Sequence, residues 1–184
     1  MSHEHWAIDK DHSGIHFSVR HMVIAKVRGH FAQWSGTVIE EGHDFARATV
    51  DVRIDAASID TGVVDRDKHL KSADFLDVAK YPEITFRGKR VERRKGDRLD
   101  VVGDLTIRSV TREIVLDVER TGRTKDPWGH ERAGFAARAS LDRREFGLTW
   151  NQALETGGIV VGDRIEIDIE VEAVKQTASM VAAG

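Results

Sequence analysis

The sequence predicts an all-β protein that forms a single antiparallel β-barrel of about eight strands, with one or two short helices near residues 61–76. The main observation is that apolar and polar residues alternate with a period of two along almost the whole chain, so each strand has one apolar face. Segments that are apolar on both faces are missing, which argues against a parallel sheet covered by helices. With so little helix to cover them, the apolar faces must meet inside a barrel or between two stacked sheets.

The alternation also locates the strands. Segments in which it is clear are 15–19, 46–54, 99–107, 114–118, 133–141 and 165–171. Turn sequences rich in glycine at 95–97 and 126–129 join consecutive strands as hairpins, so neighbouring strands should be antiparallel.

The alternation fails between residues 61 and 75, where Val64, Leu70 and Phe75 are separated by charged residues. We place the short helices here, and they should end before Tyr81-Pro82 because the residue preceding a proline is pushed out of the helical region. Irregular links are expected at 21–26 and at 143–158.

Small residues on the inward faces favour a barrel with a lumen over a filled sandwich, because a filled core would use bulky side chains. These small residues are Ala46, Ala48, Gly103, Ala133, Ala137 and Ala139. A lumen lined by aromatic and branched aliphatic residues would suit a hydrocarbon chain. The alternative is that bulkier neighbours fill the space completely.

We expect a bound ligand to contact apolar residues from several strands and from the helical segment, together with His21. The expected contact residues are Phe17, Val19, His21, Met22, Phe31, Ala48, Val50, Val52, Leu70, Phe75, Leu76, Phe86, Leu105, Phe135, Ala137 and Trp150. His21 shares the phase of Ile15, Phe17 and Val19, so its ring could meet a ligand headgroup at the end of a strand. The alternative for His21 is a hydrogen bond to a backbone carbonyl that holds the following loop.

Composition limits the other functions that the chain could have. A length of 184 residues fits one domain, which we place at residues 1–175 with a disordered tail at 176–184. The net charge of −3 is spread along the chain, whereas a nucleic-acid-binding protein would concentrate its basic residues on one face. Cysteine is absent, which excludes disulfides, thiolate metal sites and cysteine nucleophiles. Neither an export signal nor an apolar run of about 18 residues appears, so we expect a cytoplasmic protein with no integral membrane span.

The charged clusters do not form a recognisable catalytic or metal-binding motif. Of the nine histidines, His3 and His5 form an H-x-H pattern near the terminus, but zinc needs three or four converging ligands, so we expect no metal site. Arg66, Asp67 and His69 do not share one helix face, which favours a role in holding the helix rather than in catalysis. The arginine-rich segments 90–95 and 143–144 are expected to be solvated hairpin ends.

Several short segments resemble the YceI-like family in an order and spacing that run from Trp6 to Val174. They are 9–21 (DKDHSGIHFSVRH), 27–31 (VRGHF), 59–61 (IDT), 66–70 (RDKHL), 75–77 (FLD), 81–86 (YPEITF), 103–107 (GDLTI) and 141–147 (LDRREFG). Two residues depart from the family pattern: Ser109 stands where glycine is frequent, and Glu113 stands where proline is common. Both departures fall near a predicted hairpin end.

The resemblance implies a lipocalin-like barrel that binds a long-chain amphiphile, such as a polyisoprenoid, an isoprenoid quinone or a fatty amide, without covalent chemistry or a cofactor. Such binding would serve storage, transport or stress protection. Two alternatives remain open at this point: an enzyme acting on an isoprenoid or fatty substrate, and a structural or interaction protein with a filled core. The sequence leaves a homodimer open as well.

Overall fold

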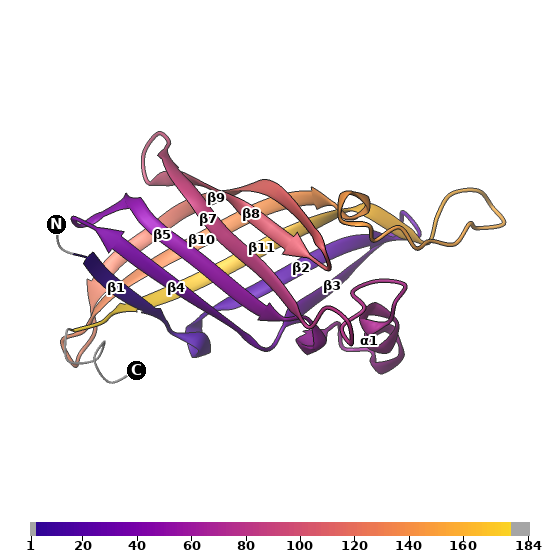
Figure 1. The fold of residues 1–184 in the computed structure, drawn as a ribbon, viewed down its shortest axis with the longest axis horizontal. Helices are drawn as coiled ribbons and strands as arrows, with labels where there is room; N and C mark the ends of the chain where they lie inside the picture. Colours follow the sequence, from indigo (N-terminus) through magenta and orange to yellow (C-terminus); the bar gives the residue numbers. More distant parts are fainter. Residues whose placement is uncertain (1–2, 178–184) are drawn as a thin grey trace.

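Eight antiparallel strands close into a barrel in the computed structural model, which describes residues 3–177 (Figure 1). Neighbouring strands around the barrel follow chain order, and the first strand pairs back with the last, so the wall has no free edge there. The barrel strands are β1 (His3–Ile8), β4 (Trp34–Glu41), β5 (Asp44–Asp55), β7 (Glu83–Arg93), β8 (Arg98–Ile107), β9 (Val110–Lys125), β10 (Glu131–Asp142) and β11 (Val161–Lys175). The predicted fold class is confirmed.

Three further strands extend the wall beside the first part of β11: β2 (Gly14–His21), β3 (Ala25–Phe31) and β6 (Ile59–Asp60). A short 3₁₀ turn, η1 (Lys10–His12), separates β1 from β2. Strand β11 pairs with β2 through residues 161–170 and with β1 through residues 173–175, so β1 and β2 lie end to end along it. The wall is therefore continuous along one side of the barrel.

The two glycine turns form the predicted hairpins because Gly96 and Gly129 adopt positive φ angles of 73° and 90°. Strands β8 and β9 meet in a tight turn in which Arg108 has a φ of 55°. Ser109 lies in this turn. Glu113, the second departure from the family pattern, lies inside β9 and accepts a 2.9 Å bond from Lys89, so it does not disturb the turn.

The helical segment forms one short helix, α1 (Val64–Lys71), followed by turns. Arg66 and Asp67 both bind Thr61: Arg66 donates to its hydroxyl at 2.7 Å, and Asp67 accepts from the same hydroxyl at 2.6 Å. These bonds fasten α1 to the end of β6, in agreement with the structural role predicted for the cluster. No residue of α1 is fully buried, and the helix lies at one end of the barrel (Figure 1). Two 3₁₀ turns, η2 (Ala56–Ser58) and η3 (Arg143–Phe146), complete the elements.

The opposite end of the barrel is filled by aromatic rings and a buried ion pair. Trp6, Phe45 and Phe135 pack in series, with ring centroids 5.4 and 4.9 Å apart. Glu40 is completely buried beside them and accepts bonds from the Trp6 indole N–H at 3.1 Å and from Arg123 at 2.5 Å. Burial raises the pKa of Glu40, and the Arg123 charge opposes this rise. Both oxygens of Glu40 thus accept a hydrogen bond, which allows a carboxylate inside an apolar end.

A bulge in the β4–β5 pairing corrects the predicted inward face of β5. The register shifts between Ile39 and Glu41, so that Phe45 rather than Ala46 faces the interior. Alternation from residue 48 onward follows the prediction. Period-two patterning cannot locate a bulge. The inserted residue exchanges the inward and outward faces of the strand but leaves no signal in the residue types.

At the same end, Arg132 joins three acidic residues. Its guanidinium donates to Asp9 at 2.8 Å, Glu172 at 2.5 Å and Asp126 at 3.0 Å. His12, Asp9 and Glu172 form a group of possible metal ligands, whose ligand atoms lie within 4.8 Å of one another. Arg132 already supplies the positive charge among these carboxylates. His3 and His5 are residues of strand β1.

The first residues of the predicted tail, 176 and 177, lie in the part of the chain that the structure describes. The Gln176 backbone N–H donates to the His5 carbonyl at 2.8 Å. The remainder of the predicted tail, 178–184, lies outside the described residues. No helix among residues 3–177 is long and apolar enough to cross a membrane.

Asp126 should make folded stability depend on pH below about 4. Burial alone would raise its pKa, but bonds from the His130 N–H, Arg132 and the Trp128 N–H outweigh burial and lower the pKa to about 2. A carboxyl with a lowered pKa stabilises the fold above its unfolded-state pKa, and this contribution is lost as the pH falls toward the folded-state value. We therefore expect Asp126→Asn to lower the melting temperature at pH 7 and to flatten its decline between pH 4 and pH 2.

The control is Asp168→Asn, at an exposed ion pair on β11, which should follow the wild-type curve. Thermal unfolding by circular dichroism across this pH range measures all three proteins. Parallel curves for Asp126→Asn and wild type would contradict the assignment.

Candidate functional site

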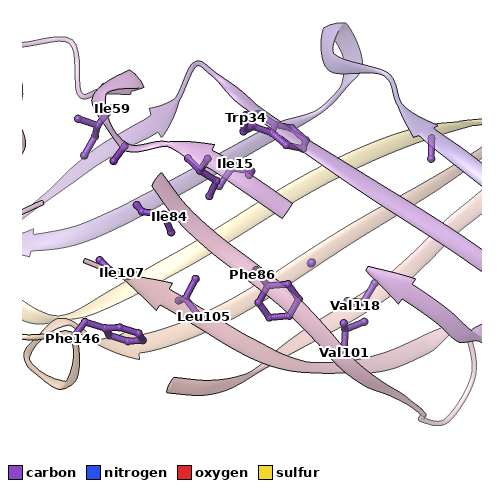
Figure 2. Packing of buried hydrophobic residues seen from close by; sticks show 14 of the residues in the cluster. Ile15, Trp34, Ile59, Ile84, Phe86, Val101, Leu105, Ile107, Val118 and Phe146 are labelled. Carbon is purple, nitrogen blue, oxygen red and sulfur yellow. The ribbon is translucent and has the colours of Figure 1, made fainter. Parts of the chain in front are cut away.

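The barrel encloses a cavity of about 290 Å³ whose walls are almost entirely apolar. Buried side chains from strands far apart in the sequence form its wall, and Figure 2 labels several of them, including Trp34, Phe86 and Leu105. Side chains therefore do not fill the interior, although the filled-core alternative required them to do so. A space of this size exceeds what a few ordered waters occupy, and its apolar walls offer water few partners.

Most of the predicted contact residues line this cavity. They are Phe17, Val19, Phe31, Ala48, Val50, Val52, Leu70, Phe75, Leu76, Phe86, Leu105, Phe135 and Ala137. His21, Met22 and Trp150 do not line it. Period-two phase thus identified wall residues well within the strands and less well at their ends.

His21 and Met22 lie where the β2–β3 hairpin leaves the barrel. His21 pairs with Val161 and Ala25 at the end of β2, beyond the last cavity-lining residue of that strand, Val19. Met22 enters the turn with a φ of 50° and is 39% exposed. The phase of a strand predicts which wall face a side chain takes, but it does not tell where the wall stops enclosing the cavity.

The lining also includes residues that were not singled out for contact. Examples are Ile84, Leu99, Val101, Ile107, Leu116 and the alternating isoleucines of β11. Their signal was present, since each lies on the apolar face of an alternating segment or, for Ile84, two residues before the chosen Phe86. Trp34 and Phe45 also line the cavity, but they lie next to a strand break and a bulge, where phase cannot be read.

The small inward residues have two different roles. Ala48 and Ala137 line the cavity and leave room in it. Gly103 instead makes room for a neighbour, because a Cβ atom there would lie 2.5 Å from the Phe86 ring. Ala133 is buried in the wall without lining the cavity. Small side chains therefore indicated the lumen correctly only at some positions.

One end of the cavity is covered by the segment that contains α1 and by the loop after η3. Phe75 and Leu76, from the turns after α1, are buried against the cavity. Trp150 lies behind Phe75, with ring centroids 5.4 Å apart, and contacts the His69 ring at 4.5 Å. His69 also bonds to Asp74 at 2.8 Å. We call Leu70, Phe75, Leu76 and Trp150 the cap, because they join these two segments over one end of the cavity.

Arg143 is a buried cation at the capped end, and its placement overturns the prediction of a solvated hairpin end. It is 2% exposed and lines the cavity. Its guanidinium donates to the carbonyls of Leu148 at 2.6 Å, Trp150 at 2.9 Å and Gly162 at 2.9 Å. Burial lowers the pKa of Arg143 from its ordinary value, and Asp163, 3.4 Å away, opposes this. The adjacent Arg144 is exposed, as predicted.

These bonds explain why the sequence was misleading here. A charged residue in a loop is usually solvated, but several carbonyls from residues 148–162 converge on Arg143 and replace its water. Convergence of backbone groups from a distant segment leaves no trace in local composition. Arg143 therefore holds the loop that carries Trp150.

The cavity lacks the arrangement that a catalytic site would need. Among the described lining residues only His16 and Arg143 have polar side chains, and the donors of Arg143 are occupied by carbonyls. On α1, Arg66 and Asp67 turn toward Thr61, whereas His69 turns toward Asp74 and Trp150. No convergent polar triad is present in the part of the cavity that the structure describes.

Comparison with known proteins agrees with the resemblance noted in the sequence. Residues 6–173 match the YceI-like domain family. Protein YceI of Escherichia coli O157:H7 is 36% identical over 173 residues, which cover 93% of this chain and 87% of that protein. The crystal structure of the Campylobacter jejuni YCEI protein superposes with a TM-score of 0.74 at 33% identity, covering 86% of this chain and 90% of that one.

A more distant structure has the same fold. A polyisoprenoid binding domain from Saccharophagus degradans, implicated in plant cell wall breakdown, gives a TM-score of 0.69 at 16% identity, covering 93% of this chain and 98% of that one. At this identity the likeness concerns the fold alone.

Removing the Arg143 guanidinium should destabilise the capped end. Arg143→Met keeps much of the side-chain volume but leaves buried carbonyls without donors, at about 1–3 kcal/mol for each unsatisfied group. We expect a loss of at least about 3 kcal/mol in the free energy of unfolding, measured in urea, with faster proteolysis within residues 149–160.

Arg144→Met is the matched control, since Arg144 is exposed and its pairs with Asp142 and Asp163 lie at the surface. Its loss should stay below about 1 kcal/mol. Equal losses for the two variants would show that Arg143 does not hold the loop.

Proposed function

This chain belongs to the YceI-like family, and on that premise we propose that its cavity binds the hydrocarbon tail of a long-chain amphiphile without changing it chemically. The proposed ligands are a polyisoprenoid, an isoprenoid quinone or a fatty amide. The observation that carries the proposal is the apolar cavity inside a closed barrel, whose lining comes from nearly every strand of the wall. Storage, transport and stress protection are the roles that such binding would serve.

Burial of the tail would supply the affinity. Transfer of apolar surface from water stabilises a complex by about 25 cal/mol per Å², less the entropy lost on association and on ordering the tail. The cavity lining offers no strong polar partner deep inside, so a purely apolar tail fits better than a polar molecule of the same size. The Saccharophagus degradans domain, which shares the fold and is a polyisoprenoid binding domain, supports a ligand of this class.

The two ends of the barrel differ in a way that suggests the direction of binding. The Trp6–Phe45–Phe135 end is closed by packed rings and the Glu40–Arg123 pair. The other end is covered by the cap beside α1, a helix with no fully buried residue. The cap comes from a helix, the turns after it and a loop rather than from wall strands, so we propose that the tail passes there and that the headgroup stays near the cap.

The proposal includes the absence of catalysis and a cytoplasmic location. The first rests on the apolar lining, in which the two polar residues are not arranged for acid–base or nucleophilic chemistry. Cell fractionation would test the second.

Organic extraction of the purified protein followed by mass spectrometry tests the ligand class directly. We expect a long-chain isoprenoid or fatty amphiphile to copurify, and the same compound to raise the melting temperature when added back, since a ligand that favours the native state stabilises it. Chemically altered lipid after incubation with the protein would instead favour an enzyme.

Filling the cavity should abolish binding while the protein still folds. Ala137 lines the wall of the cavity from β10, so Ala137→Trp places an indole in the space that the tail would occupy. We expect at least a ten-fold loss in affinity for an added isoprenoid, about 1.4 kcal/mol, with a far-ultraviolet spectrum like that of wild type. The neighbouring variant Arg138→Trp, at a side chain that is 84% exposed on the same strand, should bind normally. Normal binding by Ala137→Trp would place the ligand elsewhere.

Weakening the cap should speed ligand exchange more than it weakens the fold. Trp150→Ala removes the ring contacts that join the two segments of the cap, but it leaves the cavity walls intact. We expect the dissociation rate of a bound isoprenoid to rise several-fold in stopped-flow displacement, because most affinity differences between related complexes lie in that rate. The surface variant Trp128→Ala, at an indole that is 79% exposed, is the control. An unchanged dissociation rate in Trp150→Ala would exclude the cap as the exchange route.

A further inference from the structure

The turn between β2 and β3 presents consecutive apolar side chains to solvent at the capped end of the barrel. Met22, Val23 and Ile24 are 39%, 72% and 81% exposed. Ile159 adds a fourth side chain from the loop after η3, because the Met22 N–H donates to the neighbouring Val160 carbonyl at 2.8 Å. We call these four residues the apolar tip. A contiguous exposed apolar group of this kind is unfavourable in water and is typical of an interaction surface.

The backbone of the tip shows that these residues are not the ones that the turn itself favours. Met22 and Val23 have φ angles of 50° and 66°. This left-handed region suits glycine or asparagine, whereas a β-branched residue such as valine adopts it rarely and with strain. The turn therefore displays valine where a polar residue would fold more easily.

The hairpin that carries most of the tip is positively charged. Residues 14–31 contain Arg20, Lys26 and Arg28 but no acidic residue, although the whole chain has a net charge of −3. All three cations are exposed, and none of the ion pairs among the described residues involves them. An apolar tip with unpaired cations beside it complements a surface that is apolar inside and negatively charged outside.

We propose that the apolar tip and these three cations dock the capped end of the barrel onto an anionic lipid bilayer. The side chains of Val23 and Ile24 would enter the interface, while the cations would lie at the level of the phosphates. This inference goes beyond binding in the cavity, since it concerns the surface on which the protein would exchange its ligand.

Docking at the tip would bring the cap to the bilayer. Strand β11 starts at Val161, which pairs with His21 next to the tip. The Asn151 side chain bonds to both the carbonyl and the N–H of Val161, at 2.8 and 3.1 Å, and Asn151 directly follows Trp150 of the cap. The β2–β3 hairpin, this loop and α1 occupy the same end of the molecule in Figure 1, away from the termini.

The strongest competing surface lies at the other end of β11. Trp128, 79% exposed in the β9–β10 turn, is also suited to an interface. Its turn, however, contains Asp126 and precedes Glu131, and Arg132 beside it is already paired with acidic residues. Lys125 beside this turn is exposed and in no ion pair among the described residues, but residues 125–131 carry a net charge of −1. The Trp128 turn therefore suits an anionic surface less well than the tip does.

The test is cosedimentation with vesicles of phosphatidylglycerol mixed with phosphatidylcholine, compared with vesicles of phosphatidylcholine alone. Wild type should bind the anionic vesicles, and added salt should weaken this binding. The double variant V23N/I24S should lose about ten-fold in partitioning, and K26Q/R28Q should lose a similar amount or more. Because asparagine suits the φ of residue 23, V23N/I24S should fold at least as well as V23S/I24S.

Trp128→Ser is the matched control and should partition as wild type does. The proposal is overturned if wild type ignores anionic vesicles, if V23N/I24S and K26Q/R28Q bind them normally, or if Trp128→Ser alone loses binding. It is equally overturned if wild type dimerises in sedimentation equilibrium and V23N/I24S does not, while vesicle binding is absent; the tip would then be a contact between two copies. Binding of an isoprenoid in detergent solution should be unchanged in the tip variants, so a negative result would leave the proposed cavity function intact.

Discussion

The closure of the barrel by β11 is the constraint on which the other features depend. This strand pairs with β10 along its length and, on its other side, with β2 and then β1. Only three register pairs join β11 to β1, but Arg132 binds Asp9 and Glu172 on either side of that seam, and Lys175 binds Glu4 across it. Because the seam is held in this way, the inner face can remain apolar without a packed second layer behind it.

A closed wall of this kind still has two open ends, and the chain treats them differently. At one end, rings and a fully bonded Glu40 replace solvent completely. At the other, the cover consists of a short helix, the turns after it and a long loop. Apolar packing of Phe75 and Leu76 closes this end, and Arg143 holds the loop through backbone carbonyls. Directional bonds to a loop fix its position while burying little surface, so this end can open without disturbing the strands. This asymmetry is the basis for the proposal that a ligand enters the cavity from the capped end.

Much of the fold could be predicted because, wherever the strands are regular, residues that alternate in the sequence take opposite faces of the strand. Ala48, Val50, Val52, Phe86 and Leu105 all line the cavity as their phase requires. The failures fall where regularity ends: Phe45 replaces Ala46 at a bulge, and His21 and Met22 lie beyond the enclosed part of β2. Arg143 failed for a different reason, since its solvation is replaced by carbonyls from a segment that lies 5 to 19 residues away in the sequence. Period-two patterning predicts which face of a strand a residue takes. The positions of these residues depend instead on where the barrel wall ends and on which backbone groups converge there.

The same distinction explains why the capped end concentrates the features that patterning did not anticipate. Regular strands bury their apolar residues by geometry. Ile24 lies in a turn at the capped end and stays exposed, so this geometric constraint does not apply to it. At this end the chain places strained Val23, unpaired cations and a buried arginine. The strained Val23 and the unpaired cations cost folded stability or contribute nothing to it, and natural sequences keep such costs chiefly at functional sites, whereas Arg143 stabilises the loop of the cap. The capped end is therefore where function, rather than closure of the barrel, determines the choice of residues.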